Sequence, residues 1–166
     1  LARVVETVTE LRRRKGMVTD ESNPDSVSAG SFFTNPVVTA SEFDAFIERE
    51  KAQGLGLTAP VPHFPAEGGR VKLAAGWLVE NAGFSRGYGA GAIRVSSKHA
   101  LALVHHGGGT TKELLALART IRDGVRAKFG VELVPEPVLL SNLLFVAVTL
   151  KTFSRYKPAP NPNPPD

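Results

Sequence analysis

The chain has 166 residues, of which 42% are hydrophobic and 22% charged, a composition typical of one globular domain with its own core. Its net charge of +4 suits an anionic ligand, but the chain lacks the clustered basic residues of a nucleic-acid-binding protein. It has no cysteine, which excludes disulfides and thiolate metal sites and fits a reducing compartment, and no apolar run approaches the ~20 residues of a membrane span.

The first third of the chain predicts a helix, a loop and a strand. Apolar residues at helical spacing predict a helix over residues 2–14, which ends in a basic run before Gly16. That basic run either stabilises the helix C-terminus or binds a phosphate. Turn-forming residues predict a loop over residues 19–30, and β-branched residues predict a strand over residues 31–38.

A second helix is expected to follow this strand. Ser41 is the predicted N-cap, with Asp44 three residues later as a capping-box analogue, and the helix ends near Gly54. Glycine and proline then predict a loop over residues 54–70, with a short extended piece at residues 61–64.

The second half of the chain predicts two helices on either side of a pair of strands. A short helix is expected over residues 74–81, and strands over residues 93–96 and 100–105. Thr110 and Glu113 form a capping box for a long helix over residues 111–129, the element with the clearest local signals.

The C-terminal part is expected to be extended and then disordered. Residues 131–138 predict a strand or an extended arm. Residues 143–150 are apolar but too short to cross a bilayer. Residues 158–166 alternate proline with polar residues, a composition typical of a disordered tail.

The stretch Gly30–Pro36 carries the clearest candidate for chemistry. Ser31 stands between a glycine, which allows close backbone approach, and two phenylalanines that can fix its surroundings. An amide follows at Asn35. The alternative is an ordinary apolar strand followed by a turn.

Glu136 is a second candidate, because it lies between two prolines inside an apolar stretch. A stiffly held carboxylate in apolar surroundings can be catalytic, whereas a solvated carboxylate on an edge strand is the alternative. His63 is interpreted as a packed or solvated side chain, since no partner stands at metal-ligand spacing, and no metal site is expected.

Several stretches together resemble the C-terminal part of the UDP-N-acetylenolpyruvoylglucosamine reductases, the flavoenzymes also called UDP-N-acetylmuramate dehydrogenases. The similarity spans about residues 5–140, and these short sequences look most like those of actinobacterial members. The matching pieces are Arg14–Met17, Ala29–Pro36, Val71–Leu78, Ala82–Phe84, Ser97–Ala100, Phe129–Val131 and Pro135–Val138.

The resemblance implies an α+β fold, in which a small mixed or antiparallel sheet packs with helices. Residues 1–141 would be the substrate-binding domain, and residues 142–166 an extension that such family members lack. The chain starts at Leu1 and its one methionine is Met17, so we expect a piece of a longer protein whose flavin-binding domains precede it.

The reaction that the resemblance implies is reduction of UDP-N-acetylglucosamine enolpyruvate to UDP-N-acetylmuramate, with FAD and NADPH, in peptidoglycan precursor synthesis in the cytoplasm. Ser31 would give a proton to the carbanion-like intermediate, and Glu136 would polarise it or relay a proton. Asn35 and Lys15 would bind substrate, Lys15 at the nucleotide phosphates. No nucleic acid or membrane partner is expected.

Two other classes remain open from the residues alone. A serine hydrolase would need Ser31 beside a histidine base that an orienting carboxylate holds, and the chain has no G-x-S-x-G elbow. A non-catalytic module that binds a nucleotide sugar or an anion would need neither, and the isolated chain, without a flavin site, is expected to be inactive as a reductase.

Overall fold

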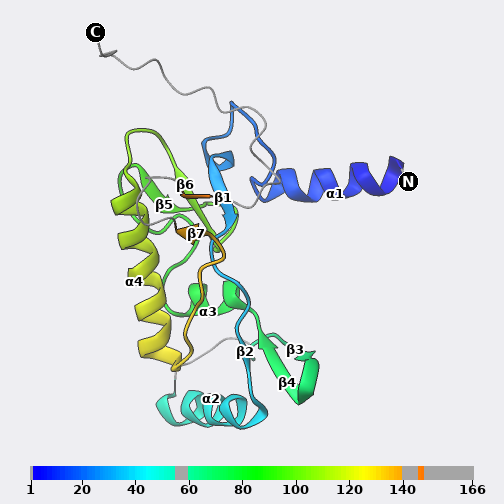
Figure 1. Ribbon diagram of the computed structural model, residues 1–166, viewed down its shortest axis with the longest axis vertical. Coiled ribbons are helices and arrows are strands. Elements are labelled where there is room, and N and C mark those ends of the chain that lie inside the picture. The colour runs from blue at the N-terminus through cyan, green and yellow to red at the C-terminus, as the bar shows by residue number, and fades with distance from the viewer. Residues whose placement is uncertain (1, 55–59, 140–145, 148–166) are drawn as a thin grey trace. The chain divides into compact units, whose positions relative to one another are not determined.

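The computed structural model describes residues 2–54, 60–139 and 146–147 (Figure 1). Contacts divide the chain into two compact units, Leu1–Glu136 and Pro137–Asp166. The described part of the second unit is a two-stranded antiparallel pair, β7 (Val138–Leu139) with β8 (Val146–Ala147). The predicted disordered tail at 158–166 lies outside the described residues.

The first unit contains a three-stranded antiparallel sheet that carries the candidate serine. Its strand order is β1 (Ser28–Ser31), β6 (Ala102–His105), β5 (Ile93–Val95). The strands β5 and β6 form the hairpin expected from the alternating apolar residues. The long helix α4 (Thr111–Phe129) packs beside β5, with the bounds that the sequence predicts (Figure 1).

A second antiparallel sheet has the order β2 (Val37–Val38), β4 (Arg70–Leu73), β3 (His63–Ala66). The helix α2 (Ala40–Gln53) contacts β4 and α4. The helical elements that complete the unit are α1 (Ala2–Arg14), η1 (Pro24–Ser26), η2 (Glu67–Gly69) and α3 (Ala75–Asn81).

The predicted continuous strand over residues 31–38 is wrong. Strand β1 begins earlier, at Ser28, and ends at Ser31, while β2 belongs to the other sheet. Between them Phe33 forms an isolated bridge with Pro135. The β-branched run sets only the short β2, because the chain has to cross from one sheet to the other.

The predicted cap of α2 is also wrong, by two residues. Thr39 is the N-cap: its N–H donates to Glu42 Oε2 at 2.7 Å, and its hydroxyl accepts from the Glu42 N–H at 3.2 Å. Ser41 already lies inside the first turn. In α4 the predicted box forms, with the Thr110 N–H donating to Glu113 Oε2 at 2.7 Å.

The core lies between the two sheets and the helices α2, α3 and α4. Aromatic rings join the three helices, since the Phe129 ring centroid lies 5.7 Å from both Phe46 and Trp77. The largest fully buried side chains include Phe32, Leu73, Leu78, Ile121 and Leu133. This arrangement confirms the predicted α+β class, with antiparallel sheets among the described residues.

The helix α1 stands apart from this core. Its apolar stripe of Val4, Val5, Val8 and Leu11 is 47–66% exposed. Its C-terminal end is nevertheless tied to the unit through Gly16, which is buried and has a φ of 69°. A Cβ at Gly16 would lie 3.1 Å from the Asp25 carbonyl oxygen, so α1 ends in close contact with the η1 turn. None of the described helices is long and apolar enough to cross a membrane.

Candidate active site

The Ser31 hydroxyl lies beside the imidazole of His99. Ser31 Oγ and His99 Nε2 are 3.1 Å apart, although the two residues are 68 positions apart in the sequence. Ser31 ends strand β1, and His99 lies in the turn that joins β5 to β6. Both side chains are half-buried.

The pairing between strands β1 and β6 is irregular just before Ser31. Ser28 pairs with Val104 and Ser31 with Ala102, which leaves one extra residue on β1. Gly30 absorbs this bulge with a φ of 80°, a conformation that a side chain would strain. Beyond Ser31, Phe32 is 1% exposed, and its N–H donates to the Leu101 carbonyl at 2.8 Å.

A buried carboxylate fixes the turn that carries His99. Asp25 accepts hydrogen bonds from the Ser97 N–H at 2.7 Å, the Ser97 hydroxyl at 2.7 Å and the Ser96 hydroxyl at 2.9 Å. Ser96 Oγ in turn accepts from the Lys98 N–H at 3.0 Å. The backbone immediately before His99 is therefore held by one side chain from η1.

The same carboxylate contacts a second histidine. Asp25 Oδ1 lies 3.0 Å from Nε2 of His106, the residue that directly follows β6. Burial raises the pKa of Asp25, but hydrogen bonds from Ser97, Ser96 and His106 outweigh it and lower this pKa to about 2. Asp25 is therefore a charged anchor that joins η1, the β5–β6 turn and β6.

The charge on Lys15 reaches the Ser31–His99 pair. The pKa of His99 is lowered by burial first and by the Lys15 ammonium second, and the Glu80 carboxylate opposes them. Lys15 directly follows α1 and precedes the buried Gly16. Lys15 therefore acts electrostatically on His99, the imidazole that contacts Ser31.

Asn35 lies on the other side of the buried phenylalanines and has a structural contact of its own. Its Oδ1 accepts a hydrogen bond from the Ala75 N–H at 2.9 Å. Ala75 is the first residue of α3, and the preceding Ala74 has no side chain that can cap it. Asn35 therefore caps this helix from a distant segment, while the residue itself is exposed.

Glu136 lies next to the serine strand, in the solvated surroundings that the sequence left open as one of two alternatives. Its N–H donates to the Phe32 carbonyl at 2.9 Å, and Pro135 pairs with Phe33. The side chain is exposed and makes no hydrogen bond to Ser31. The carboxylate is in solvent because the segment that carries it pairs with Phe32 and Phe33 through its backbone.

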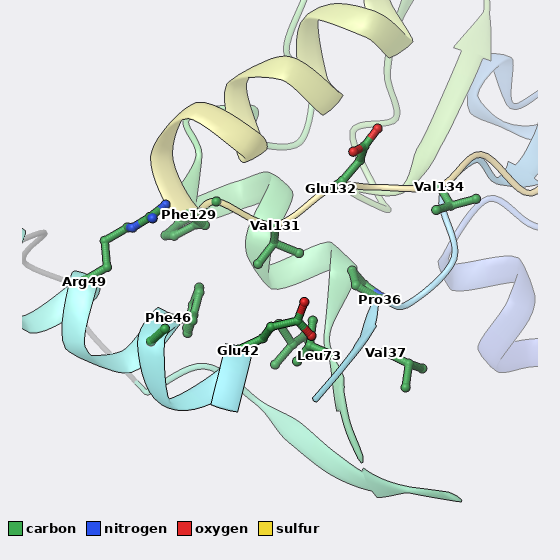
Figure 2. Close-up of a pocket in the computed structure, with 13 residues that line it drawn as sticks. Pro36, Val37, Glu42, Phe46, Arg49, Leu73, Phe129, Val131, Glu132 and Val134 are labelled. Atoms are coloured by element: carbon green, nitrogen blue, oxygen red, sulfur yellow. The ribbon is translucent and has the colours of Figure 1, made fainter. Parts of the chain in front are cut away.

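Figure 2 shows a groove that lies elsewhere in the unit. Its volume is about 470 Å³, and α2, the end of α4 and the segment after it form its walls. Its lining includes Arg49, Phe46, Phe129 and Val131 but none of Ser31, His99 and Lys15. The chemistry-bearing residues therefore do not share this groove.

The geometry meets only part of what a serine hydrolase needs. Ser31 does lie beside a histidine, but no carboxylate among the described residues hydrogen-bonds to His99. The buried Asp25 is bonded to His106 instead. Among the described residues no cluster of three metal-ligating side chains occurs, and the His63 ring lies 4.7 Å from Phe43 with Nδ1 3.0 Å from the Val61 carbonyl.

Sequence reasoning missed His99 and Asp25 as parts of the site. The segment Ser97–Ala100 stood among the pieces of the resemblance, which is the one signal that could have drawn attention to His99. Asp25 lies in the predicted 19–30 loop, where the sequence gives no signal that sets it apart from the other turn-forming residues. Neither contact can be inferred from local spacing, because the partners are 68 to 81 positions apart.

The fold and this site define a small α+β domain that presents a serine–histidine pair at the end of an antiparallel strand. A known family matches it: the C-terminal domain of UDP-N-acetylenolpyruvoylglucosamine reductase matches residues 23–140. The chain belongs to this family.

Full-length relatives extend the similarity. The chain is 59% identical over 140 residues to the UDP-N-acetylenolpyruvoylglucosamine reductase of Mycolicibacterium gilvum, covering 83% of this chain and 38% of that protein. The corresponding enzyme of Thermobifida fusca is 53% identical over 140 residues, covering 84% and 39%. The Streptomyces coelicolor enzyme is 54% identical over 133 residues, covering 80% and 34%. The chain thus spans less than two fifths of the length of these relatives.

Proposed function

We propose that this chain is the substrate-binding part of a flavin-dependent reductase that converts UDP-N-acetylglucosamine enolpyruvate to UDP-N-acetylmuramate. The family match over residues 23–140 supports the class of reaction. The observation that carries the site is the half-buried Ser31 hydroxyl beside His99, whose pKa the Lys15 charge helps to lower. A proton donor and a cationic neighbour are what reduction of an anionic enol ether requires.

The flavin is expected in the parts of the longer protein outside this chain, so none of the described residues is assigned to it. When bound, it supplies the hydride that reaches the enolpyruvyl carbon, with NADPH as the source of electrons. This chain has to do the rest: hold the nucleotide sugar, stabilise the charge that develops beside the carboxylate, and deliver one proton.

Ser31 is the proposed proton donor. A hydroxyl is a weak acid, but a carbanion-like carbon is a strong base, so direct transfer is feasible when the two atoms are held in contact. The bulge at Gly30 and the buried Phe32 hold the backbone on both sides of Ser31. A positioned general acid is typically worth ~10²–10⁴ in rate.

Lys15, Asn35 and Glu136 are the other proposed contacts with the substrate. Lys15 is exposed and would bind the nucleotide phosphates. The Asn35 oxygen is used by α3, so its amide N–H groups are the part left for substrate. Glu136 would approach the intermediate from the segment paired with Phe32 and Phe33.

The test is Ser31→Ala in the full-length protein that carries this chain. Flavin absorbance in a stopped-flow instrument separates reduction by NADPH from reoxidation by the enolpyruvyl substrate. We expect normal reduction and reoxidation at least ~100-fold slower. Ser85→Ala, which removes an exposed hydroxyl outside strand β1, is the matched control and should reoxidise normally. Unimpaired reoxidation in Ser31→Ala would remove Ser31 from this role.

A nucleotide-sugar-binding module without catalysis is the other outcome that this test can reveal. In that case the full-length protein would bind UDP-N-acetylglucosamine, as calorimetry would measure, without any reoxidation of its flavin by the enolpyruvyl ether.

A further inference from the structure

The contact between Ser31 and His99 has two possible directions. A serine hydroxyl has one hydrogen, and the Oγ–Nε2 separation of 3.1 Å fits either atom as donor. If Ser31 donated to His99, its hydrogen would point at the imidazole and away from any substrate. If His99 donates, the hydrogen of Ser31 stays free.

We propose that His99 is a positioning residue for Ser31, with the proton of a neutral imidazole on Nε2 and donated to Ser31 Oγ. This inference rests on the proposed function of Ser31 as proton donor. It assigns His99 the task of directing the single hydrogen of Ser31 towards the substrate and of stabilising the oxygen that remains.

The surroundings of His99 favour the neutral form. Burial and the Lys15 ammonium both lower its pKa, against the opposing Glu80 carboxylate. A neutral imidazole carries one proton, on Nε2 or on Nδ1. No described residue hydrogen-bonds to Nδ1, so nothing in the described chain favours a proton there, while Nε2 faces an oxygen that can accept.

The turn that carries His99 is held firmly enough for this task. Asp25 accepts three hydrogen bonds from Ser96 and Ser97, just before His99. After it, the Ala102 N–H donates to the His99 carbonyl at 3.0 Å. A side chain on such a turn loses little further entropy when it orients a neighbour.

The proton balance is simple. The O–H bond of Ser31 breaks as a C–H bond forms at the carbanion-like carbon, whose electron pair makes the new bond. The electron pair of the O–H bond stays on Oγ, which becomes negatively charged and is later protonated by water. The Nε2–H of His99 then faces an anionic oxygen, and a hydrogen bond to an ion is stronger than one between neutral groups. The contact therefore stabilises the transition state more than the ground state.

Kinetics of the full-length protein test the consequence. His99→Leu removes the donor, His99→Gln keeps an N–H group, and His63→Leu, at an exposed histidine on β3, is the control. We expect His99→Leu to slow flavin reoxidation by the enolpyruvyl substrate roughly 10- to 100-fold, with flavin reduction and substrate KM unchanged. His99→Gln should recover most of the rate. In Ser31→Ala, adding His99→Leu should slow reoxidation no further, because the two act through one oxygen.

Two outcomes separate this inference from the proposed function. If Ser31→Ala stalls reoxidation but His99→Leu reoxidises at the wild-type rate, His99 has no such role and Ser31 keeps its own. If Ser31→Ala reoxidises normally, the proposed role of Ser31 fails, and the positioning role of His99 fails with it.

A measurement on the unmutated protein does not depend on whether a variant folds. Two-bond ¹H–¹⁵N NMR spectra of the full-length protein with ¹⁵N-labelled histidine report which ring nitrogen carries the proton, and His99→Gln assigns the signal. We expect a neutral ring with the proton on Nε2 at pH 7. A ring protonated on Nδ1, with Nε2 as acceptor, would overturn the proposal.

Discussion

The buried Asp25 carboxylate should make the stability of the domain depend on acid pH. Its pKa is lowered from 3.8 to about 2, because the hydrogen bonds from Ser97, Ser96 and His106 outweigh burial. A carboxylate with a lowered folded-state pKa contributes stability above its unfolded pKa, and this stability is lost as the pH falls through the folded value. The window therefore runs from about pH 5 down to about pH 2.

The magnitude follows from the size of the shift. The shift from 3.8 to about 2 corresponds to roughly 2–3 kcal/mol of unfolding free energy at neutral pH. About half of this should remain near pH 3, and little near pH 2. The residue is 5% exposed, so solvent screening does not reduce this figure much.

The perturbation is Asp25→Asn, which keeps the shape but removes the titrating group. The amide oxygen can still accept from Ser96 and Ser97, while the amide nitrogen faces His106. Urea unfolding from pH 6 to pH 2, followed by circular dichroism, gives the unfolding free energy of both proteins. We expect the difference between them to shrink by about 2 kcal/mol over this range.

The control is Asp44→Asn, which makes the same change of charge on the exposed surface of α2. Its effect should stay within about 0.5 kcal/mol at every pH, as is usual for surface substitutions. A difference between wild type and Asp25→Asn that stays constant from pH 6 to pH 2 would refute the reasoning, since it would mean that Asp25 has the same pKa in both states.

Two further predictions concern packing and substrate binding. Gly124→Ala in α4 should destabilise the protein by about 1–3 kcal/mol in thermal unfolding, because the new Cβ would lie 2.5 Å from the buried Phe84 ring. This clash should outweigh the better helix propensity of alanine. Adding Phe84→Leu to Gly124→Ala should recover part of the loss, and a single variant as stable as the wild type would contradict the packing argument. Lys15→Met should raise the substrate KM of the full-length protein by roughly tenfold, because a phosphate contact worth about 1.4 kcal/mol is lost, and flavin reduction should not change. The control is Arg12→Met, three residues earlier in the chain. An unchanged KM in Lys15→Met would exclude the phosphate contact.

The elements that could be predicted from the sequence are those with complete local signals. The helix α4 has an N-cap, a reciprocal glutamate, an apolar stripe and a terminal glycine, and all of them agree within one stretch of chain. The β5–β6 hairpin likewise follows from alternating apolar residues around a short polar turn. In both, the hydrogen bonds that define the element join residues no more than 12 positions apart in the sequence.

The two elements that were predicted wrongly differ in cause. At the start of α2 the signal is local: two hydroxyl residues compete for the cap, and Thr39 is the cap because Glu42 stands three residues later and completes the capping box. The strand predicted over residues 31–38 depends instead on partners far away in the sequence. The chain between Ser31 and Val37 leaves one sheet for the other, and its partners are Leu101 and Pro135. No local pattern states which sheet a short strand joins.

The candidate site divides in the same way. The Ser31 hydroxyl could be identified as a candidate because it stands in a short, distinctive stretch, and the resemblance implies its role as proton donor. The group that sets the direction of its hydrogen could not, since His99 reaches it only when β1 pairs with β6 and the turn before β6 is pinned by Asp25. A proton donor needs more than an acidic hydrogen: the hydrogen has to point at the acceptor, and that orientation is a property of the folded sheet. The chemistry of Ser31 therefore depends on a pairing of strands as much as on the residue itself.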